Sequence, residues 1–291
     1  MIKSHKFYGE YHGHMDVHLK YVLKYLKHIN KTNIVYLAGD SSLDNKYWLD
    51  IKVPACNGYQ KILDPAISTP DVAHWMNELM VMNKMDKWCC INTAVEESTV
   101  AMRKKDLLDQ DKFIQKNITE NDVLIVSVGG NDVALKIGIK TIFHLGKLLL
   151  LTNDKDIKNS GSFLHLVNIF KNQTQPYISK LVKYNNPKLI IISSMYFPCL
   201  YGKGWADKTL KLFNYDKNYK KIHHIMKSIY EEATCKIKIK GSKVVTCKLF
   251  EVLDYKNKDD YIQRVEPSVT GGSKMAIEYI KIINKYIYEL D

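Results

Sequence analysis

Two short motifs in this chain carry residue types suited to acyl-transfer chemistry. Gly39-Asp40-Ser41 follows an apolar run, and about ninety residues later Gly129-Gly130-Asn131-Asp132 follows another. A serine on the turn after a strand can act as a nucleophile. An asparagine amide on a neighbouring strand end can donate a hydrogen bond to the oxyanion that forms during acyl transfer. The pairing of Ser41 with Asn131 therefore predicts a serine hydrolase that cleaves an ester or acyl group.

The surrounding pattern indicates the elements that must position these side chains. Apolar runs predict strands at 34–37, 88–91, 123–128, 189–192 and 243–246, and helical spacing predicts helices at 14–29, 71–80, 134–151, 162–184, 216–233 and 273–289. Strands separated by helices imply a mainly parallel sheet of about five strands with helices on both faces, an α/β fold. Ligands of such sheets bind beyond the carboxyl ends of the strands. Ser41, Asn92 and Asn131 all follow such ends, so we expect them to converge at one edge.

Composition narrows the class of protein. The 291 residues are 46% hydrophobic, which is enough for one substantial domain, and we expect 1–291 to form it. The chain has no apolar run long enough to cross a membrane, and its first residues lack the pattern of a secretory signal, so we expect none. Its six cysteines are scattered and lack metal-ligand spacing, which favours reduced thiols in an intracellular, cytoplasmic protein. The histidines near the N-terminus also lack convincing metal-ligand spacing, so we expect no metal.

The net charge of +12 raises the question of nucleic acid or anionic membrane partners. The excess is almost entirely lysine, dispersed along the chain and mixed with Asp and Glu, and the only arginines are Arg103 and Arg264. Specific recognition of bases and phosphates favours the arginine fork. We therefore expect no specific nucleic-acid binding. Heavy use of Lys, Asn, Ile and Tyr is typical of coding from an AT-rich genome, such as that of a giant virus or a protist.

With these blocks in this order, the chain resembles the SGNH/GDSL hydrolase (esterase/lipase) superfamily over nearly its whole length. The resemblance implies a three-layer α/β/α, flavodoxin-like fold, with Ser41 as nucleophile and the Asn131 amide, beside Gly130, at the oxyanion. The family's second block matches in outline from Asn92 to Thr99. There Glu97 replaces the glycine whose backbone N–H faces the oxyanion, which requires that the Glu97 carboxylate point away or be paired.

The last block departs most from the family pattern. Members of the family carry an aspartate and a histidine before the final helix, whereas this chain has Gln263 and Glu266 at those positions and no histidine after His224. An unperturbed glutamate has a pKa near ~4.3 against ~6.5 for histidine, a deficit of about 3 kcal/mol as a base at neutral pH. Burial that raised the pKa by about two units would remove it. We expect Glu266 to be the base, with a histidine elsewhere in the chain as a less favoured substitute.

Each residue also has a purely structural interpretation. Ser41 could cap a helix, and Asn131 could bond its own turn. Asn92 could fix the second-block loop, with substrate contact as the alternative. Arg264 could pair Glu97 or Glu266, bind an anionic substrate group, or lie on the surface as an ordinary arginine. The segment 200–209, with two glycines and Trp205, is predicted to be a loop able to act as a lid.

Two functions remain open at this point. The first is an ester or O-acyl hydrolase that acts on a small-molecule substrate and needs no cofactor. The alternative is a catalytically inactive protein of the same fold that binds an acylated or glycan ligand in the same cleft. The sequence leaves the oligomeric state open.

Overall fold

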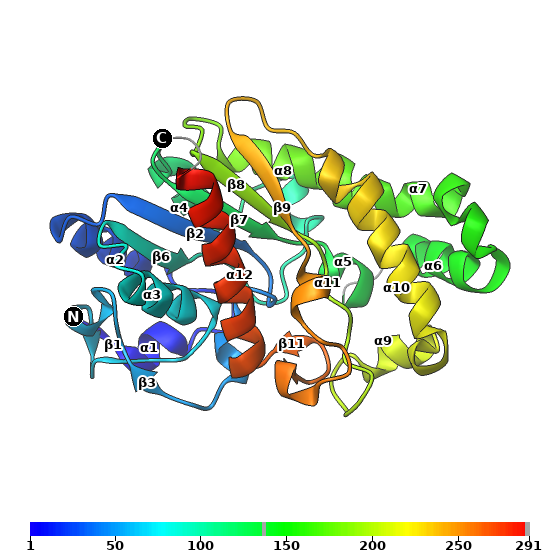
Figure 1. Cartoon of the computed structure of the whole chain (residues 1–291), viewed down its shortest axis with the longest axis horizontal. Coiled ribbons are helices and arrows are strands. Elements are labelled where there is room, and N and C mark those ends of the chain that lie inside the picture. The colour runs from blue at the N-terminus through cyan, green and yellow to red at the C-terminus, as the bar shows by residue number, and fades with distance from the viewer. Residues whose placement is uncertain (136–137, 289–291) are drawn as a thin grey trace.

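A five-stranded parallel sheet forms the centre of the molecule (Figure 1). The computed structural model describes residues 1–135 and 138–288. The strands lie in the order β6-β2-β7-β8-β9, and every neighbouring pair is parallel. Their bounds are β2 Asn33–Gly39, β6 Trp88–Asn92, β7 Val123–Ser127, β8 Leu189–Ser193 and β9 Lys243–Cys247. All five predicted strands are therefore confirmed.

The strand order identifies where a ligand can bind. In order along the chain these are the first to fifth main strands, so the sheet reads 2-1-3-4-5, the flavodoxin-like arrangement. The connection from β2 runs to β6 on one side, and the connection from β6 runs back past β2 to β7 on the other side. In such sheets the crevice lies beyond the carboxyl ends of the two strands at this switch point. Ser41 follows β2 and Asn131 follows β7.

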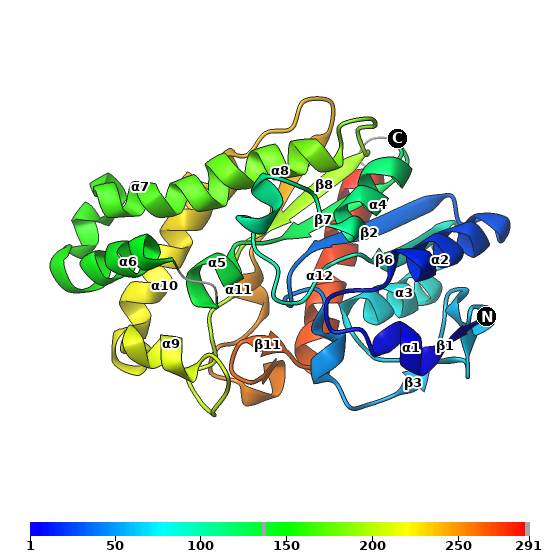
Figure 2. The same cartoon turned by 180° about the vertical axis from the view of Figure 1, so that it is seen from behind.

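Helices cover both faces of the sheet, because alternate strand residues point to opposite sides. Ile34, Tyr36 and Ala38 pack toward α2 (Asp16–His28), α4 (Asp109–Asn117) and α8 (Thr174–Leu181), seen in front of the sheet in Figure 2. Val35 and Leu37 pack toward α3 (Val72–Met82), α11 (Leu249–Val252) and α12 (Val269–Tyr288). The predicted α/β/α class is confirmed.

A third group of helices extends beyond the sheet edge (Figure 1). It comprises α5 (Gly130–Ala134), α6 (Ile139–Leu151), α7 (Gly161–Val167), α9 (Asp207–Leu212) and α10 (Tyr215–Glu232). Its own apolar cluster includes Leu149, Leu166 and Ile229. The helix predicted at 162–184 is divided, since a π-helical segment, Asn168–Gln173, joins α7 to α8. The helix predicted at 134–151 spans positions 136–137, which lie outside the described residues, as does position 289 of the last predicted helix.

Short elements complete the fold around the sheet. Helix α1 is Ser4–Tyr8, and three two-stranded ribbons pair β1 with β4, β3 with β5, and β10 with β11. These strands are β1 Ile2–Lys3, β3 Val53–Pro54, β4 Leu63–Asp64, β5 Ile67–Ser68, β10 Tyr261–Ile262 and β11 Glu266–Pro267. The last ribbon matters for function because its second strand begins at Glu266.

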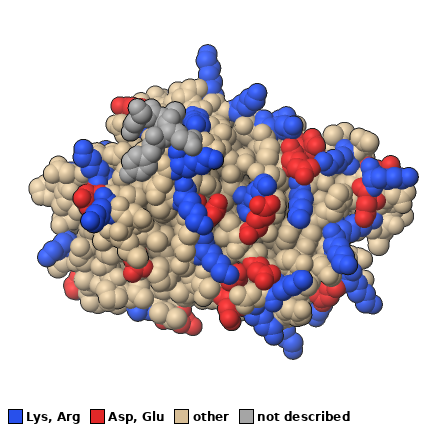
Figure 3. Space-filling view, in the orientation of Figure 1, with Lys and Arg blue, Asp and Glu red and all other residues tan. Residues whose placement is uncertain are grey.

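The surface charge follows the dispersion seen in the sequence. On the face shown in Figure 3, Lys and Arg side chains are spread over the whole surface with Asp and Glu among them. Among the described residues, none of the helices is both long and apolar enough to cross a membrane.

Candidate active site

Close packing and hydrogen bonds at Gly39 fix the end of β2, two residues before Ser41. Gly39 lies so close to β7 that a Cβ there would stand 2.1 Å from the Ser127 carbonyl oxygen, so only glycine fits. The Gly39 carbonyl accepts hydrogen bonds from the Val95 N–H at 3.0 Å, the Ser98 hydroxyl at 3.0 Å and the Arg103 guanidinium at 2.9 Å. Three donors on one carbonyl hold the end of β2 in place, and they thereby position the turn that carries Ser41.

Two adjacent serines leave this strand, and they have different partners. The Asp40 carboxylate accepts from the Ser42 N–H at 3.1 Å and the Ser42 hydroxyl at 2.7 Å. The Ser42 hydroxyl is also 2.7 Å from the Ser127 hydroxyl. Ser42 is thus held within the turn. Ser41 is buried, lines the main pocket, and lies close enough to the Glu266 carboxyl to lower the pKa of that group.

Asn131 reaches the same pocket from β7. Gly129 has a φ of +100° and its α-carbon faces the Phe170 ring, so glycine is required where the strand turns into α5. Asn131 is buried, and its amide nitrogen donates to the Ser98 carbonyl at 3.1 Å, which uses one of its two hydrogens. Gly130 and Asn131 both line the pocket beside Ser41. The expected convergence of residues 41 and 131 is present.

Asp132 connects two loops at this end of the sheet. Its carboxylate accepts from the Val100 N–H at 2.9 Å and the Ala101 N–H at 3.1 Å. The loop after β6 is thereby tied to the loop after β7, which carries Asn131.

Glu266 lies at the start of β11, in the β10–β11 ribbon. Gln263 and Arg264 both have positive φ, at 53° and 70°, and form the tight turn between the two strands. The Glu266 side chain is only 1% exposed, and its Oε1 accepts from the Trp205 indole N–H at 3.0 Å. Burial raises the pKa of Glu266 to about 7, while the contacts with Ser41 and Trp205 lower it and the charges of Asp40 and Asp44 raise it. This pKa is close to that of an ordinary histidine.

A second buried carboxyl, Glu96, lies near Glu266. Burial raises its pKa most, and the charge of Glu266 raises it further. Two carboxyls that interact in a buried site cannot both ionise easily, so Glu96 is the member that stays protonated at neutral pH. Oε2 of each of the two carboxyls has no hydrogen-bond partner among the described residues. Glu96 is therefore a second proton-binding group close to Glu266.

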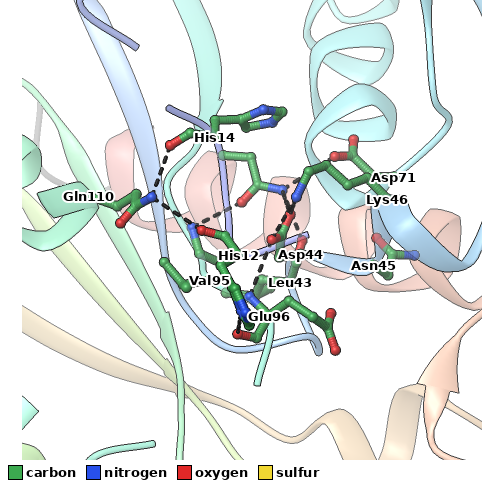
Figure 4. A network of polar contacts seen from close by, with 12 residues as sticks. His12, His14, Leu43, Asp44, Asn45, Lys46, Asp71, Val95, Glu96 and Gln110 are labelled. Carbon is green, nitrogen blue, oxygen red and sulfur yellow. Dashed lines mark hydrogen bonds and ion pairs between the residues drawn. The ribbon is translucent and has the colours of Figure 1, made fainter. Parts of the chain in front are cut away.

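A network of polar contacts holds the backbone on which Glu96 lies (Figure 4). The Asp44 carboxylate is paired with the buried Lys46 ammonium at 2.6 Å and accepts from the Glu96 N–H at 3.3 Å. The Gln110 amide donates to the His12 and His14 carbonyls, and the His12 ring lies 3.4 Å from the Glu96 carbonyl oxygen. These contacts join the Ser41 loop to the second-block loop.

The second-block residues lie beside the pocket rather than in its lining. The Asn92 amide donates to the Leu43 carbonyl and to the carboxylates of Asp44 and Asp71, and its oxygen accepts from the Ala94 N–H. Its side chain therefore fixes the loop, the structural alternative of the two. Glu97 has a φ of +56°, the left-handed conformation that favours the family's glycine. Its carboxylate accepts a hydrogen bond from the Tyr11 hydroxyl at 3.0 Å.

The two arginines hold structure together. Arg103 pairs with Asp111 at 2.9 Å, and both side chains are fully buried. The Arg264 guanidinium contacts the carboxylates of Asp207 at 3.1 Å and Asp216 at 2.8 Å and donates to the carbonyls of Cys199 and Leu200. Neither guanidinium lines the pocket. Of the alternatives for Arg264, the ordinary surface arginine is wrong, because the residue is buried and bonded to the two aspartates at the starts of α9 and α10.

The pocket has a polar end and an apolar interior, with a volume of about 180 Å³. Asp40, Ser41, Asn131, Trp205 and Glu266 form the polar end. The interior is lined by side chains of the third helix group and its neighbours, among them Val133, Leu145, Leu149, Leu166, Leu210, Ile222, Ile225 and Ile229. No histidine of the described residues lines it. His223, a nearby alternative base, is stacked on Phe197 with ring centroids 3.7 Å apart, and burial lowers its pKa to about 4.

Sequence reasoning missed several residues of this site. Glu96 was passed over because a glutamate in a polar loop gives no signal of burial. The contacts of Ser98 and Arg103 with the Gly39 carbonyl join segments about sixty residues apart, which spacing alone cannot pair. The segment 200–209 is a loop as predicted only up to residue 206, because α9 begins at Asp207, and its role as a lid stays a prediction.

Comparisons with known proteins bear on the fold. No protein-family model and no curated protein sequence matches this chain. The lipase Lip_vut3 from a goat rumen metagenome has a similar structure, with 14% sequence identity, a TM-score of 0.50, and a match over 86% of this chain and 97% of that protein. A protein described as a GDSL-like lipase from Parabacteroides merdae has 13% identity and a TM-score of 0.45 over 87% and 96%.

The lipase/acylhydrolase from Enterococcus faecalis has 13% identity and a TM-score of 0.46, over 87% of this chain and 95% of that protein. At such identities the likeness concerns the fold. The likeness to Lip_vut3 shows the fold alone, and it agrees with the parallel α/β fold that the sequence predicted.

Proposed function

We propose that this protein is a serine hydrolase that cleaves an ester or O-acyl bond, with Ser41 as nucleophile and Glu266 as general base. The observation that carries the proposal is the meeting of three segments at one pocket: Ser41, Asn131 and Glu266 all line it, and Ser41 lies against the Glu266 carboxyl. A nucleophile needs a base within reach, and apo contacts between the two are commonly loose.

In the first half-reaction the Ser41 oxygen attacks the substrate carbonyl carbon while its proton passes to Glu266. The second hydrogen of the Asn131 amide, together with the backbone N–H of Ser41, holds the developing oxyanion. Glu97, which lies outside the pocket lining, takes no part in this step. The carbon–oxygen bond to the alcohol then breaks, and Glu266 returns the proton to the departing alcohol. The product of this half-reaction is an acyl ester on Ser41.

In the second half-reaction water attacks the acyl ester, and Glu266 takes its proton. Collapse of the tetrahedral species releases the carboxylic acid, and the proton returns to Ser41. A pKa near 7 suits a group that must accept and release protons at neutral pH. Burial of Glu266 therefore offsets the deficit that an ordinary glutamate would carry against histidine.

The alternative is an inactive protein that binds an acylated or glycan ligand in the same pocket. The absence of a histidine from the lining, within the described part of the chain, favours it. A pocket that has kept a serine and an amide without a base would still bind its ligand.

Labelling with a fluorophosphonate probe from about pH 4 to about pH 9 separates the two. We expect labelling that Ser41→Ala abolishes and that Ser42→Ala retains, because the Ser42 hydroxyl is already bonded to Asp40 and Ser127. We expect Glu266→Gln to lose most of it. Absence of labelling over the whole range, in a folded protein, would refute the hydrolase and favour the binding protein.

A further inference from the structure

The third helix group leaves its apolar cluster incompletely filled next to Ser41. Leu148, Phe163 and Ile169 are buried in that cluster, but Val133, Leu145, Met195, Phe213 and Ile222 are only partly buried against it. All five of these partly buried side chains line the pocket. A cavity lined by such side chains stays dry and favours an apolar guest. The unfilled space is continuous with the polar end that holds Ser41.

Three helices supply much of the apolar lining. Helix α5, which also carries Asn131, contributes Val133 and Ala134, and the other residues include Leu145 and Leu149 of α6 and Ile222 and Ile229 of α10. Glu266 and the half-buried Trp205 lie at the polar end. Since Glu266 must protonate the leaving alcohol, the alcohol belongs on its side. The substituent on the other side of the carbonyl carbon then enters the space among α5, α6 and α10.

We propose that this space is an acyl-chain site, and that the substrates are esters of medium-chain, unbranched fatty acids rather than acetyl esters. The inference rests on the proposed function and adds the substrate class to it. An apolar site gains binding free energy with each methylene group that it removes from water. We expect kcat/KM to rise about fourfold per methylene group until the chain fills the space.

Chain-length dependence tests the proposal directly. With p-nitrophenyl esters from acetyl to dodecanoyl, used below their micellar concentrations, we expect the optimum between octanoyl and decanoyl. A series of alkyl acetates, in which only the alcohol lengthens, should show a much flatter dependence. A maximum at acetyl, or an equally steep rise in the alkyl acetate series, would overturn the assignment of the pocket to the acyl chain.

Two leucines of α6 provide a matched pair of variants. Leu145 lines the pocket, whereas Leu150 is 78% exposed on the same helix. We expect Leu145→Trp to lower kcat/KM for the decanoyl ester at least about tenfold while acetyl ester hydrolysis stays within about twofold. Leu150→Trp should leave both unchanged. Equal losses on both esters in Leu145→Trp, with an unchanged melting temperature, would contradict the proposal.

A binding measurement separates failure of this inference from failure of the proposed function. Ser41→Ala protein is titrated with a fluorescent undecanoic acid derivative, which is then displaced with decanoate or acetate. Displacement by decanoate alone, weakened in Leu145→Trp, supports the acyl-chain site even if no ester is hydrolysed. Hydrolysis of acetyl esters by the unmutated protein, with no binding of the fatty acid probe, would overturn the acyl-chain site and leave the hydrolase standing.

Discussion

The Trp205 indole N–H donates to Oε1 of Glu266 at 3.0 Å, and this hydrogen bond joins the loop before α9 to the predicted base. A donor to a carboxylate stabilises its charged form, so the bond lowers the pKa of Glu266 against the rise that burial causes. The loop thus affects both the position of the base and the pH at which it can act.

We therefore expect Trp205→Phe to raise the pKa of Glu266. The base works when deprotonated, so activity rises with pH through this pKa. Because Glu266 loses the Trp205 donor in the variant, the rise in activity should move to higher pH by up to about one unit. The measurement is the pH dependence of kcat/KM. Trp75→Phe is the matched control, because the Trp75 indole N–H has no partner among the described residues. An unchanged or acid-shifted profile in Trp205→Phe would contradict the role of this bond.

Burial of Glu266 should also cost stability. Its folded-state pKa of about 7 lies above its ordinary value of 4.5, so the folded protein holds this proton more tightly than the unfolded chain. The contribution of this proton to the free energy of unfolding is fully present below about pH 4.5, and it is lost as the pH rises through about 7. Glu266→Gln removes that dependence, and we expect the variant to be more stable by about 3 kcal/mol at pH 8 and little changed at pH 4. Urea unfolding at both pH values measures this. A variant less stable at pH 8 would show that the carboxylate is well solvated or paired.

Much of this fold could be predicted from the sequence because its central strands are short, continuous apolar runs. Val123, Leu124, Ile125 and Val126 are all buried, and so is every residue of β8, as expected for strands covered on both faces. Helix α4 was missed because its buried side chains, Asp111, Phe113 and Ile114, include only two apolar residues, too few to produce a helical period.

The positions of site residues could be predicted where a motif follows a strand end. They could not be predicted where they depend on contacts between side chains from distant segments. Ser41 and Asn131 follow adjacent strands, so the sheet topology brings them together. Nothing in the sequence says that Arg264 meets Asp207 and Asp216, since these contacts depend on how the 200–216 segment folds back over the β10–β11 turn. For the same reason, the apolar pocket could not be predicted, because its lining comes from several helices whose relative positions the sequence does not specify.

Arg264 is expected to act as a clamp on this segment. Arg264→Gln removes its contacts with Asp207 and Asp216, and we expect a loss of about 2 kcal/mol in the free energy of unfolding, mostly from the buried contacts. Proteolysis within 200–216 should become faster. Because the guanidinium does not line the pocket, KM for neutral and for anionic esters should change by the same factor. A selective rise in KM for the anionic ester would instead assign Arg264 to substrate binding.

Asn131 is expected to contribute to the transition state more than to substrate binding. Its amide donates one hydrogen to the Ser98 carbonyl, which orients the group, and the other hydrogen is left for the oxyanion. We expect Asn131→Ala to lower kcat about 100- to 1000-fold with KM within about threefold, as for other oxyanion donors. Ser98→Ala is the informative companion, since its carbonyl, which receives the Asn131 bond, is unaltered while the hydroxyl that contacts the Gly39 carbonyl is lost. It should cost stability and leave most of kcat. A fall in kcat that is equal in the two variants would mean that Asn131 only braces the loop.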